Sequence, residues 1–352
     1  MMAQAEILVS REGRVGRIRL NRPKALNSLT LHMVRGFRRA LVDFASDANI
    51  FAVLVTGEGE RGLCAGGDIR RLYDLRDGDK DYYRDFWREE YELNAMIARY
   101  GKPYVVVMDG LVMGGGVGVS AHGNCRIVTE RTRLAMPETG IGFVPDVGGT
   151  WLLTRAGGAG VYLALSGATI SAADALHVGL ADVFVESQKL EGVIRRLTTI
   201  RDSSEANALL RESAGQAEIG ELAKNAETLD RVMSKDQVED ILEALESLGT
   251  SFADSAAREI RGKSPTSLKV THALLKQAMR AENLEACLIK EFRAACGLLG
   301  THDLQEGIRA AIVDKDRSPQ WRPAALEEVS EAAVAKILAG DGSPEPRFPS
   351  AP

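Results

Sequence analysis

Apolar residues in the first half of the chain alternate between short continuous runs and a helical spacing. Runs rich in Val, Ile and Leu predict strands at residues 17–20, 50–56 and 104–108, with two shorter strands at 127–128 and 134–135. Between the first two runs, five apolar residues recur at helical spacing, namely Met33, Val34, Phe37, Leu41 and Phe44. Strands that alternate with helices in this way indicate an α/β fold.

The second half of the chain has a different pattern. Residues 191–247 are charge-rich and helix-forming, and residues 268–299 carry apolar side chains at helical spacing. The last residues, 341–352, are rich in Ser and Pro, which predicts a disordered tail. We therefore expect an α/β core at residues 1–190, a helical region at 191–340 and a disordered tail at 341–352.

Composition narrows the class of protein. Hydrophobic residues make up 45% of the chain and charged residues 26%, as in ordinary globular proteins. The longest apolar runs are far shorter than the roughly 18 residues that a membrane span needs, and the N-terminus lacks the pattern of a signal peptide. Four dispersed cysteines indicate a reducing compartment, and a net charge of -5 disfavours nucleic acid as a partner. These features predict a cytoplasmic protein without a membrane or nucleic-acid partner.

Two apparent ligand motifs fail on inspection. The sequence GKS at residues 262–264 resembles the end of a phosphate-binding loop, but Ala257 replaces the first glycine and Pro265 interrupts the helix that the motif needs. The five histidines are dispersed and show no paired spacing for zinc. We therefore expect no metal site.

Glycine-rich turns follow two of the predicted strands. They are CAGGDI at residues 64–69 and MGGGVG at residues 113–118. Glycine permits close approach of backbones, and a helix that starts at each turn would leave free N–H groups at its first residues. Two such donors that converge on one carbonyl oxygen form an oxyanion hole. A tight contact between helix and sheet is the alternative explanation of these turns.

A third segment, PETGIGFVPDVGG at residues 137–149, supplies two carboxylates. Glu138 and Asp146 lie between Pro and Gly, on turns that can project them into a site, where paired carboxylates can share acid, base and nucleophile roles. Simpler explanations are an exposed loop acid for Glu138 and a helix cap for Asp146. Glu90 similarly fits a solvated helix face.

The chain resembles the enoyl-CoA hydratase/isomerase (crotonase) superfamily over about residues 5–190. The resemblance rests on NRPKALN at 21–27, CAGGD at 64–68, GGG at 114–116 and PE at 137–138. Within that superfamily, the chain is similar to the 3-hydroxyisobutyryl-CoA hydrolases. That likeness rests on FWREEY at 86–91, MGGGVG at 113–118, the segment at 137–149, EGIR at 306–309 and DKDRSPQW at 314–321.

The resemblance implies a spiral of ββα units that binds an acyl-CoA, with C-terminal helices that cover the site or mediate assembly into a homo-oligomer. It also implies that the N–H groups of Gly67 and Gly115 hold the thioester oxygen. Backbone segments around five residues would hold the CoA nucleotide, namely Lys24, Leu26, Ala65, Asp68 and Ile69.

The same resemblance implies the chemistry. Glu138 stands where the superfamily has a catalytic glutamate, whereas Gly118 replaces the second glutamate of the hydratases. Asp146 and Glu90 match residues that contact the acyl group in the hydrolases. The implied reaction is hydrolysis of a short branched 3-hydroxyacyl-CoA in valine degradation, with Glu138 as nucleophile or base, Asp146 orienting the substrate hydroxyl or the water, and Glu90 lining the acyl pocket.

No cofactor is implied beyond the coenzyme A of the substrate. Two alternatives remain open from the sequence. One is a hydratase or isomerase of the same fold, and the other is a CoA-ester-binding protein without activity.

Overall fold

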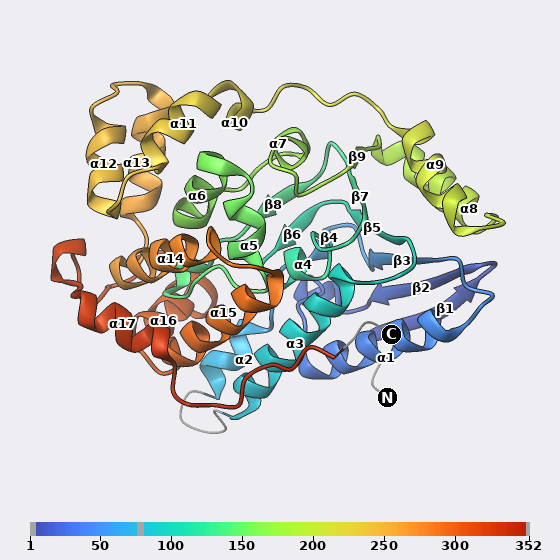
Figure 1. The fold of residues 1–352 in the computed structure, drawn as a ribbon, viewed down its shortest axis with the longest axis horizontal. Coiled ribbons are helices and arrows are strands. Elements are labelled where there is room, and N and C mark those ends of the chain that lie inside the picture. The colour runs from blue at the N-terminus through green and yellow to red at the C-terminus, as the bar shows by residue number, and fades with distance from the viewer. Residues whose placement is uncertain (1–4, 76–80, 350–352) are drawn as a thin grey trace.

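The computed structural model describes residues 5–75 and 81–349, which form an α/β fold around a six-stranded sheet (Figure 1). The strand order is β1-β2-β3-β5-β7-β9, and only the β1–β2 pair is antiparallel. The bounds are β1 (Ile7–Glu12), β2 (Val15–Leu20), β3 (Ala52–Gly57), β5 (Tyr104–Met108), β7 (Cys125–Val128) and β9 (Val183–Phe184).

A second sheet of three short parallel strands positions the site. It contains β4 (Gly62–Cys64), β6 (Leu111–Met113) and β8 (Arg133–Ala135), which follow β3, β5 and β7 of the larger sheet in turn. This repeated order builds the expected spiral. Because the three strands are parallel, their carboxyl ends meet at one edge, where ligands bind in many α/β proteins. Both glycine turns and Glu138 follow these carboxyl ends.

Helices of the first half pack on the two sheets and on one another. α1 begins after Thr30, whose side chain accepts a hydrogen bond from the N–H of Met33 and so caps the helix. α1 packs against α3. The helices are α1 (Leu31–Ser46), α2 (Ile69–Asp74), α3 (Asp81–Ala98), α4 (Gly115–Gly118), α5 (Gly149–Thr154), α6 (Gly157–Ser166) and α7 (Ala172–His177).

Beyond β9, the described chain is helical, which confirms the predicted α/β fold with a helical C-terminal portion. The helices are α8 (Leu190–Leu197), α9 (Ser203–Ser213), α10 (Glu221–Lys224), α11 (Ala226–Met233), α12 (Val238–Glu246), α13 (Ser251–Arg261), α14 (Pro265–Ala278), α15 (Leu284–Leu298), α16 (His302–Ile308) and α17 (Glu331–Ala339).

The larger sheet separates two apolar clusters. Val53 and Val55 of β3 face the main cluster, which also contains residues as distant as Phe292 of α15. Leu54 points to the opposite face, which α8 and α9 cover. This alternation is what a strand buried on both faces produces. Helices from both halves of the chain therefore share one core.

The end of the chain differs from the disordered tail that its composition predicts. Residues 341–349 are ordered, because charged side chains of α3 and α15 hold them. Arg84 pairs with Asp341 at 2.6 Å, and Arg293 pairs with Glu345 at 2.6 Å. Arg99 donates to the carbonyl oxygen of Pro349 at 3.0 Å. The rest of the predicted tail, residues 350–352, lies outside the described residues.

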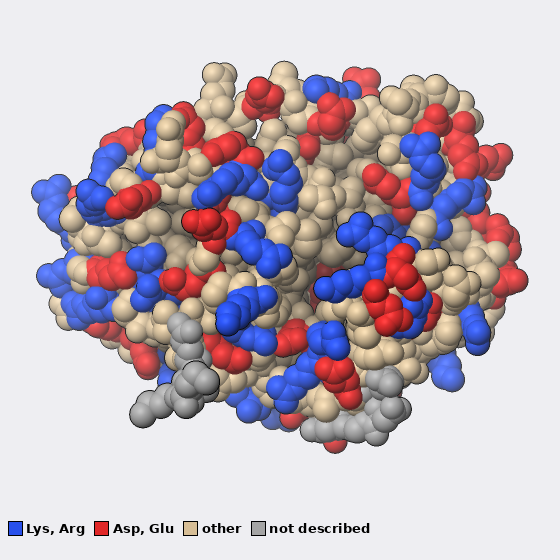
Figure 2. Space-filling view, turned by 180° about the vertical axis from the view of Figure 1, so that it is seen from behind, with Lys and Arg blue, Asp and Glu red and all other residues tan. Residues whose placement is uncertain are grey.

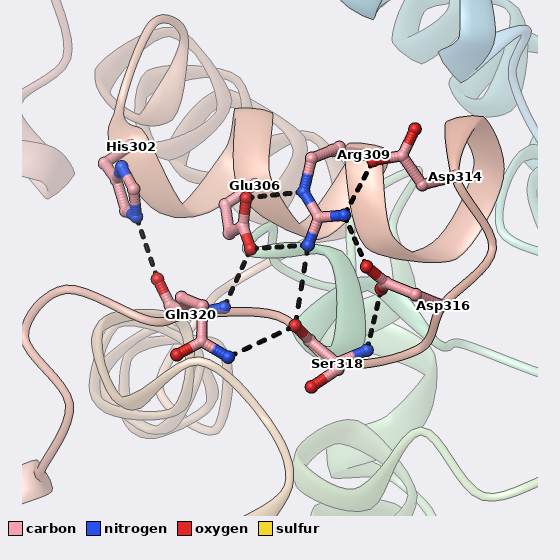
Figure 3. Close-up of polar contacts among 7 residues, drawn as sticks. All are labelled: His302, Glu306, Arg309, Asp314, Asp316, Ser318 and Gln320. Carbon is pink, nitrogen blue, oxygen red and sulfur yellow. Dashed lines mark hydrogen bonds and ion pairs between the residues drawn. The ribbon is translucent and has the colours of Figure 1, made fainter.

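One arginine joins the two C-terminal segments at residues 306–309 and 314–321 (Figure 3). Arg309 begins a π-helical turn, Arg309–Val313, directly after α16. Its guanidinium donates to Glu306 and Asp314 at 2.8 Å and to Asp316 at 2.6 Å, and the N–H of Gln320 donates to Glu306 at 2.8 Å. These bonds tie residues 314–320 to α16.

Among the described residues, no helix has the length and apolar character needed to cross a membrane.

Candidate active site

The two glycine turns meet, as the sequence predicts. Gly66 has φ +104°, and a Cβ built there would lie 3.7 Å from the nitrogen of Gly115. A Cβ at Gly116 would lie 2.4 Å from the carbonyl oxygen of Cys64, so this contact requires glycine. Among the backbone hydrogen bonds of the described turns and loops, none is donated by the N–H of Gly67 or Gly115. Both groups therefore remain available as donors.

Glu138 faces the second glycine turn. It is 7% exposed and begins the 3-10 turn η2 (Glu138–Ile141), and its Oε1 lies 2.7 Å from where a Cβ of Gly114 would stand. The alternative explanation of Glu138 as an exposed loop acid is therefore wrong. α16 packs closely against this turn, since a Cβ on Gly307 would lie 2.3 Å from the carbonyl carbon of Ile141.

Asp146 lies close to the same edge and is held by a helix residue. The hydroxyl of Tyr91 donates a hydrogen bond of 2.7 Å to Oδ2 of Asp146, and both side chains are buried. The following residue, Val147, has φ +53°, a conformation that β-branched residues rarely adopt. Such strain persists only where the surroundings impose it, and it is common at functional sites.

A residue from the C-terminal half fixes this strained turn. Glu291 of α15 accepts hydrogen bonds from the N–H groups of Gly148 at 2.7 Å and Thr150 at 2.9 Å. The N-cap of α5 is Gly148, and Glu291 satisfies the free N–H groups at the start of this helix. The alternative role of Asp146 as a helix cap is therefore wrong.

One face of α3 is directed toward the site. Trp87, Glu90, Tyr91 and Asn94 follow a helical spacing of three and four residues, and all are buried. Oε1 of Glu90 lies 2.6 Å from where a Cβ of Gly115 would stand. Glu90 thus belongs to the site and not to a solvated face.

Burial raises the pKa values of the three acids, and repulsion by charged neighbours adds to the rise for Glu90 and Glu138. Burial raises the pKa of Asp146 from 3.8 to about 7, although the hydrogen bond from Tyr91 opposes the shift. Burial, followed by the charge of Asp146, raises the pKa values of Glu90 and Glu138 well above 4.5. The cluster therefore retains protons near neutral pH, where it can both accept and release them.

Neighbouring side chains fill the space beside Gly118. A Cβ there would lie 2.7 Å from Cβ of Val147 and 2.8 Å from Nδ2 of Asn94. A larger residue at position 118 would therefore clash unless both neighbours moved.

The segments expected to hold the CoA nucleotide adjoin one another. The N–H of Ala65 donates to the carbonyl oxygen of Leu26 at 3.0 Å, and Asp68 pairs with Arg22 at 2.8 Å. Ile69 begins α2, and Lys24 is exposed on the turn η1 (Pro23–Ala25). Figure 2 shows a hollow near the centre of the rear face, with Lys and Arg side chains on both sides of it. Contact of a nucleotide with the segments around Lys24, Leu26, Ala65, Asp68 and Ile69 stays a prediction.

Sequence reasoning missed Tyr91, Asn94 and Glu291. A signal for the first two exists in the sequence, because polar Glu90 and Asn94 share a helix face with Trp87 and Tyr91, which are large and mostly apolar. Glu291 has no such signal, since its partners lie 141 and 143 residues away in the chain.

Comparison with curated proteins gives a consistent set of relatives. The 3-hydroxyisobutyryl-CoA hydrolase, mitochondrial, of Danio rerio is 40% identical over 344 residues, which cover 96% of this chain and 90% of the relative. The protein of the same name from Homo sapiens is 38% identical over 356 residues, covering 98% and 92%. These relatives are named as mitochondrial proteins, which contradicts the cytoplasmic location expected from the sequence.

Solved structures and a family model agree on the fold. A carnitinyl-CoA dehydratase from Mycobacterium thermoresistibile is 45% identical with a TM-score of 0.93, and 99% of this chain and 100% of that chain are covered. An enoyl-CoA hydratase from Rhodobacter sphaeroides is 39% identical with a TM-score of 0.88, covering 96% and 98%. The model of the enoyl-CoA hydratase/isomerase family matches residues 15–338, and the chain belongs to this family.

Proposed function

We propose that the protein hydrolyses the thioester of a short branched 3-hydroxyacyl-CoA, with 3-hydroxyisobutyryl-CoA as the substrate. The observation that carries this proposal is the buried cluster of Glu90, Glu138 and Asp146 beside the two glycine turns. Gly118 supports a hydrolase over a hydratase, because the second glutamate of the hydratases is absent and its space is filled. The relatives from Danio rerio and Homo sapiens are named 3-hydroxyisobutyryl-CoA hydrolases, which also supports a hydrolase.

The oxyanion hole acts on the thioester carbonyl. The N–H groups of Gly67 and Gly115 donate to its oxygen and stabilise the negative charge that develops there. Removal of one such donor costs about 3 kcal/mol in other enzymes. The low polarity of the buried site strengthens this interaction.

Glu138 drives the attack in one of two ways. As a base, it takes a proton from water while the water oxygen bonds to the carbonyl carbon, and it returns that proton to sulfur as the C–S bond breaks. As a nucleophile, its carboxylate displaces the CoA thiolate, which takes up a proton, and water then cleaves the resulting anhydride. Both routes convert thioester and water into free acid and CoA.

The other acids position the reactants. Asp146, held by Tyr91, orients the substrate hydroxyl or the attacking water, and Glu90 lines the acyl pocket. The segments around Lys24, Leu26 and Asp68 hold the CoA nucleotide. The proposed reaction uses no metal or redox cofactor, and coenzyme A enters as part of the substrate. The expected homo-oligomer stays a prediction that light scattering tests.

A panel of acyl-CoA esters tests the proposed function. We expect 3-hydroxyisobutyryl-CoA and 3-hydroxypropionyl-CoA to release free thiol faster than crotonyl-CoA loses its enoyl absorbance. Rapid hydration of crotonyl-CoA without thiol release would instead support an enoyl-CoA hydratase, as the name of the solved relative from Rhodobacter sphaeroides suggests. That activity would need Glu90 or Asp146 to supply the missing second acid.

A further inference from the structure

Asn94 is a fully buried polar residue in the site that the mechanism above does not use. It is 0% exposed, and it lies one helical turn beyond Glu90 on the face of α3 that borders the site. Within the described part of the chain, no group hydrogen-bonds its Nδ2 or its Oδ1. Buried side-chain amides in native proteins nearly always have partners, so an amide with neither atom paired needs an explanation.

The surroundings of Asn94 place its amide beside the second glycine turn. Its Nδ2 lies 2.8 Å from where a Cβ of Gly118 would stand, on the helical turn that begins with Gly115. Oε1 of Glu90, which also lacks a partner among the described residues, belongs to the same helix face. The unpaired atoms of both residues therefore border the space beside the oxyanion turn.

The chemistry of these atoms defines the ligand group. An amide offers both a donor and an acceptor, and a protonated Glu90 offers the same pair. A hydroxyl group also donates one hydrogen bond and accepts others, so it matches them. We propose that the side-chain amide of Asn94 binds the 3-hydroxyl group of the acyl chain and thereby selects hydroxylated esters. This inference rests on the proposed function and adds a specificity residue to it.

The physical basis of the selection is the penalty for an unpaired polar group. A site built to hydrogen-bond a substrate hydroxyl discriminates strongly against the analogue that lacks it, because its own buried groups then stay unpaired. Isobutyryl-CoA is that analogue, since it differs from 3-hydroxyisobutyryl-CoA only by the hydroxyl. The ratio of kcat/KM for the two esters therefore measures the contribution of Asn94.

The experiment compares wild-type protein with Asn94→Leu, which replaces the amide by an apolar side chain of similar size. We expect the ratio to fall about tenfold or more, as the loss of a hydrogen bond to a buried ligand group implies. We also expect the variant to melt at or above the wild-type temperature, because it removes an unpaired buried amide. The matched control is Leu93→Met, a conservative change at the neighbouring buried position, which should leave the ratio at its wild-type value.

The outcomes separate this inference from the proposed function. If wild-type protein hydrolyses neither ester, the proposed function fails. If wild-type protein hydrolyses the hydroxylated ester but Asn94→Leu slows both esters equally, Asn94 serves the attacking water or the fold, and the inference is overturned. An unchanged ratio also overturns the inference, whatever the melting temperature of the variant.

Discussion

The hydroxyl of Tyr91 lies 2.7 Å from Oδ2 of Asp146 and donates a hydrogen bond to it. This bond favours the charged carboxylate and so limits the rise in pKa that burial causes, leaving the pKa of Asp146 at about 7. In the described part of the chain, no side-chain donor lowers the pKa of Glu138 in this way, and the charge of Asp146 raises that pKa further. Tyr91 thus stabilises the ionised form of Asp146.

Tyr91→Phe should weaken catalysis and move its pH dependence. Without the donor, the pKa of Asp146 rises, so the limb of the kcat/KM profile that reports ionisation of Asp146 should shift to higher pH. At neutral pH we expect a loss of about tenfold or more, as for a hydrogen bond to a charged group. The control is Tyr100→Phe, which removes a buried hydroxyl bonded to the carbonyl oxygen of Leu41. An unshifted limb would contradict the assigned role of Tyr91.

Glu138→Gln should reduce hydrolysis about 10²- to 10⁴-fold, because glutamine keeps the shape of the side chain but cannot accept the proton or attack the thioester. Binding of the acyl-CoA should persist, as measured by calorimetry on the inactive variant. A thermal melt confirms that the variant is folded. Wild-type turnover by a folded variant would place the catalytic group elsewhere.

Asp146→Asn should stabilise the protein more at higher pH. The unfolded chain loses the Asp146 proton near pH 3.8, whereas the folded protein keeps it until about pH 7. Wild-type protein therefore loses stability as the pH rises through this window, since its folded state binds more protons than its unfolded state. The melting temperature of the variant minus that of wild type should increase from about pH 4 to about pH 7 and then level off. A constant difference would refute the raised pKa.

Gly118→Ala should destabilise the fold by about 1–3 kcal/mol, because its methyl group would overlap Val147 and Asn94. Urea unfolding measures the change. The matched control is Gly101→Ala, since a Cβ at Gly101 meets nothing within 4 Å. Equal effects of the two substitutions would show that the space beside Gly118 is not filled.

Apolar runs predicted the long buried strands and also located β7 and β8, but they gave no strand at β1, β4, β6 or β9. The run at residues 104–108 matches β5 because a strand covered on both faces is continuously apolar. β4 and β6 have three residues each, too few to show any period, and they are stabilised by pairing with strands distant in sequence. The last three residues of β1 are polar and none of its six residues is fully buried, so its run lacks the apolar density used to find strands.

The acids of the site were predictable, but their supports were not. Glu138 stands in a segment that resembles the superfamily, whereas Asp146 and Glu90 stand in segments that resemble the hydrolases. Tyr91 and Glu291 look like ordinary helix residues, and their roles depend on partners that only the folded chain brings near. The ordered end of the chain is a similar case, because ion pairs with Arg84 and Arg293 overcome a composition typical of disorder.

The contacts that hold the turns of Glu138 and Asp146 in place have a consequence for synthesis on the ribosome. Glu138 and Asp146 emerge early, but Glu291 and Gly307, which hold their turns, lie in the last fifth of the chain. Although folding during translation starts from the N-terminus, the nascent protein cannot fix these turns until nearly all of it has been made. A chain released early would therefore carry all three acids without their active arrangement, so incomplete translation products would be inactive toward the CoA ester.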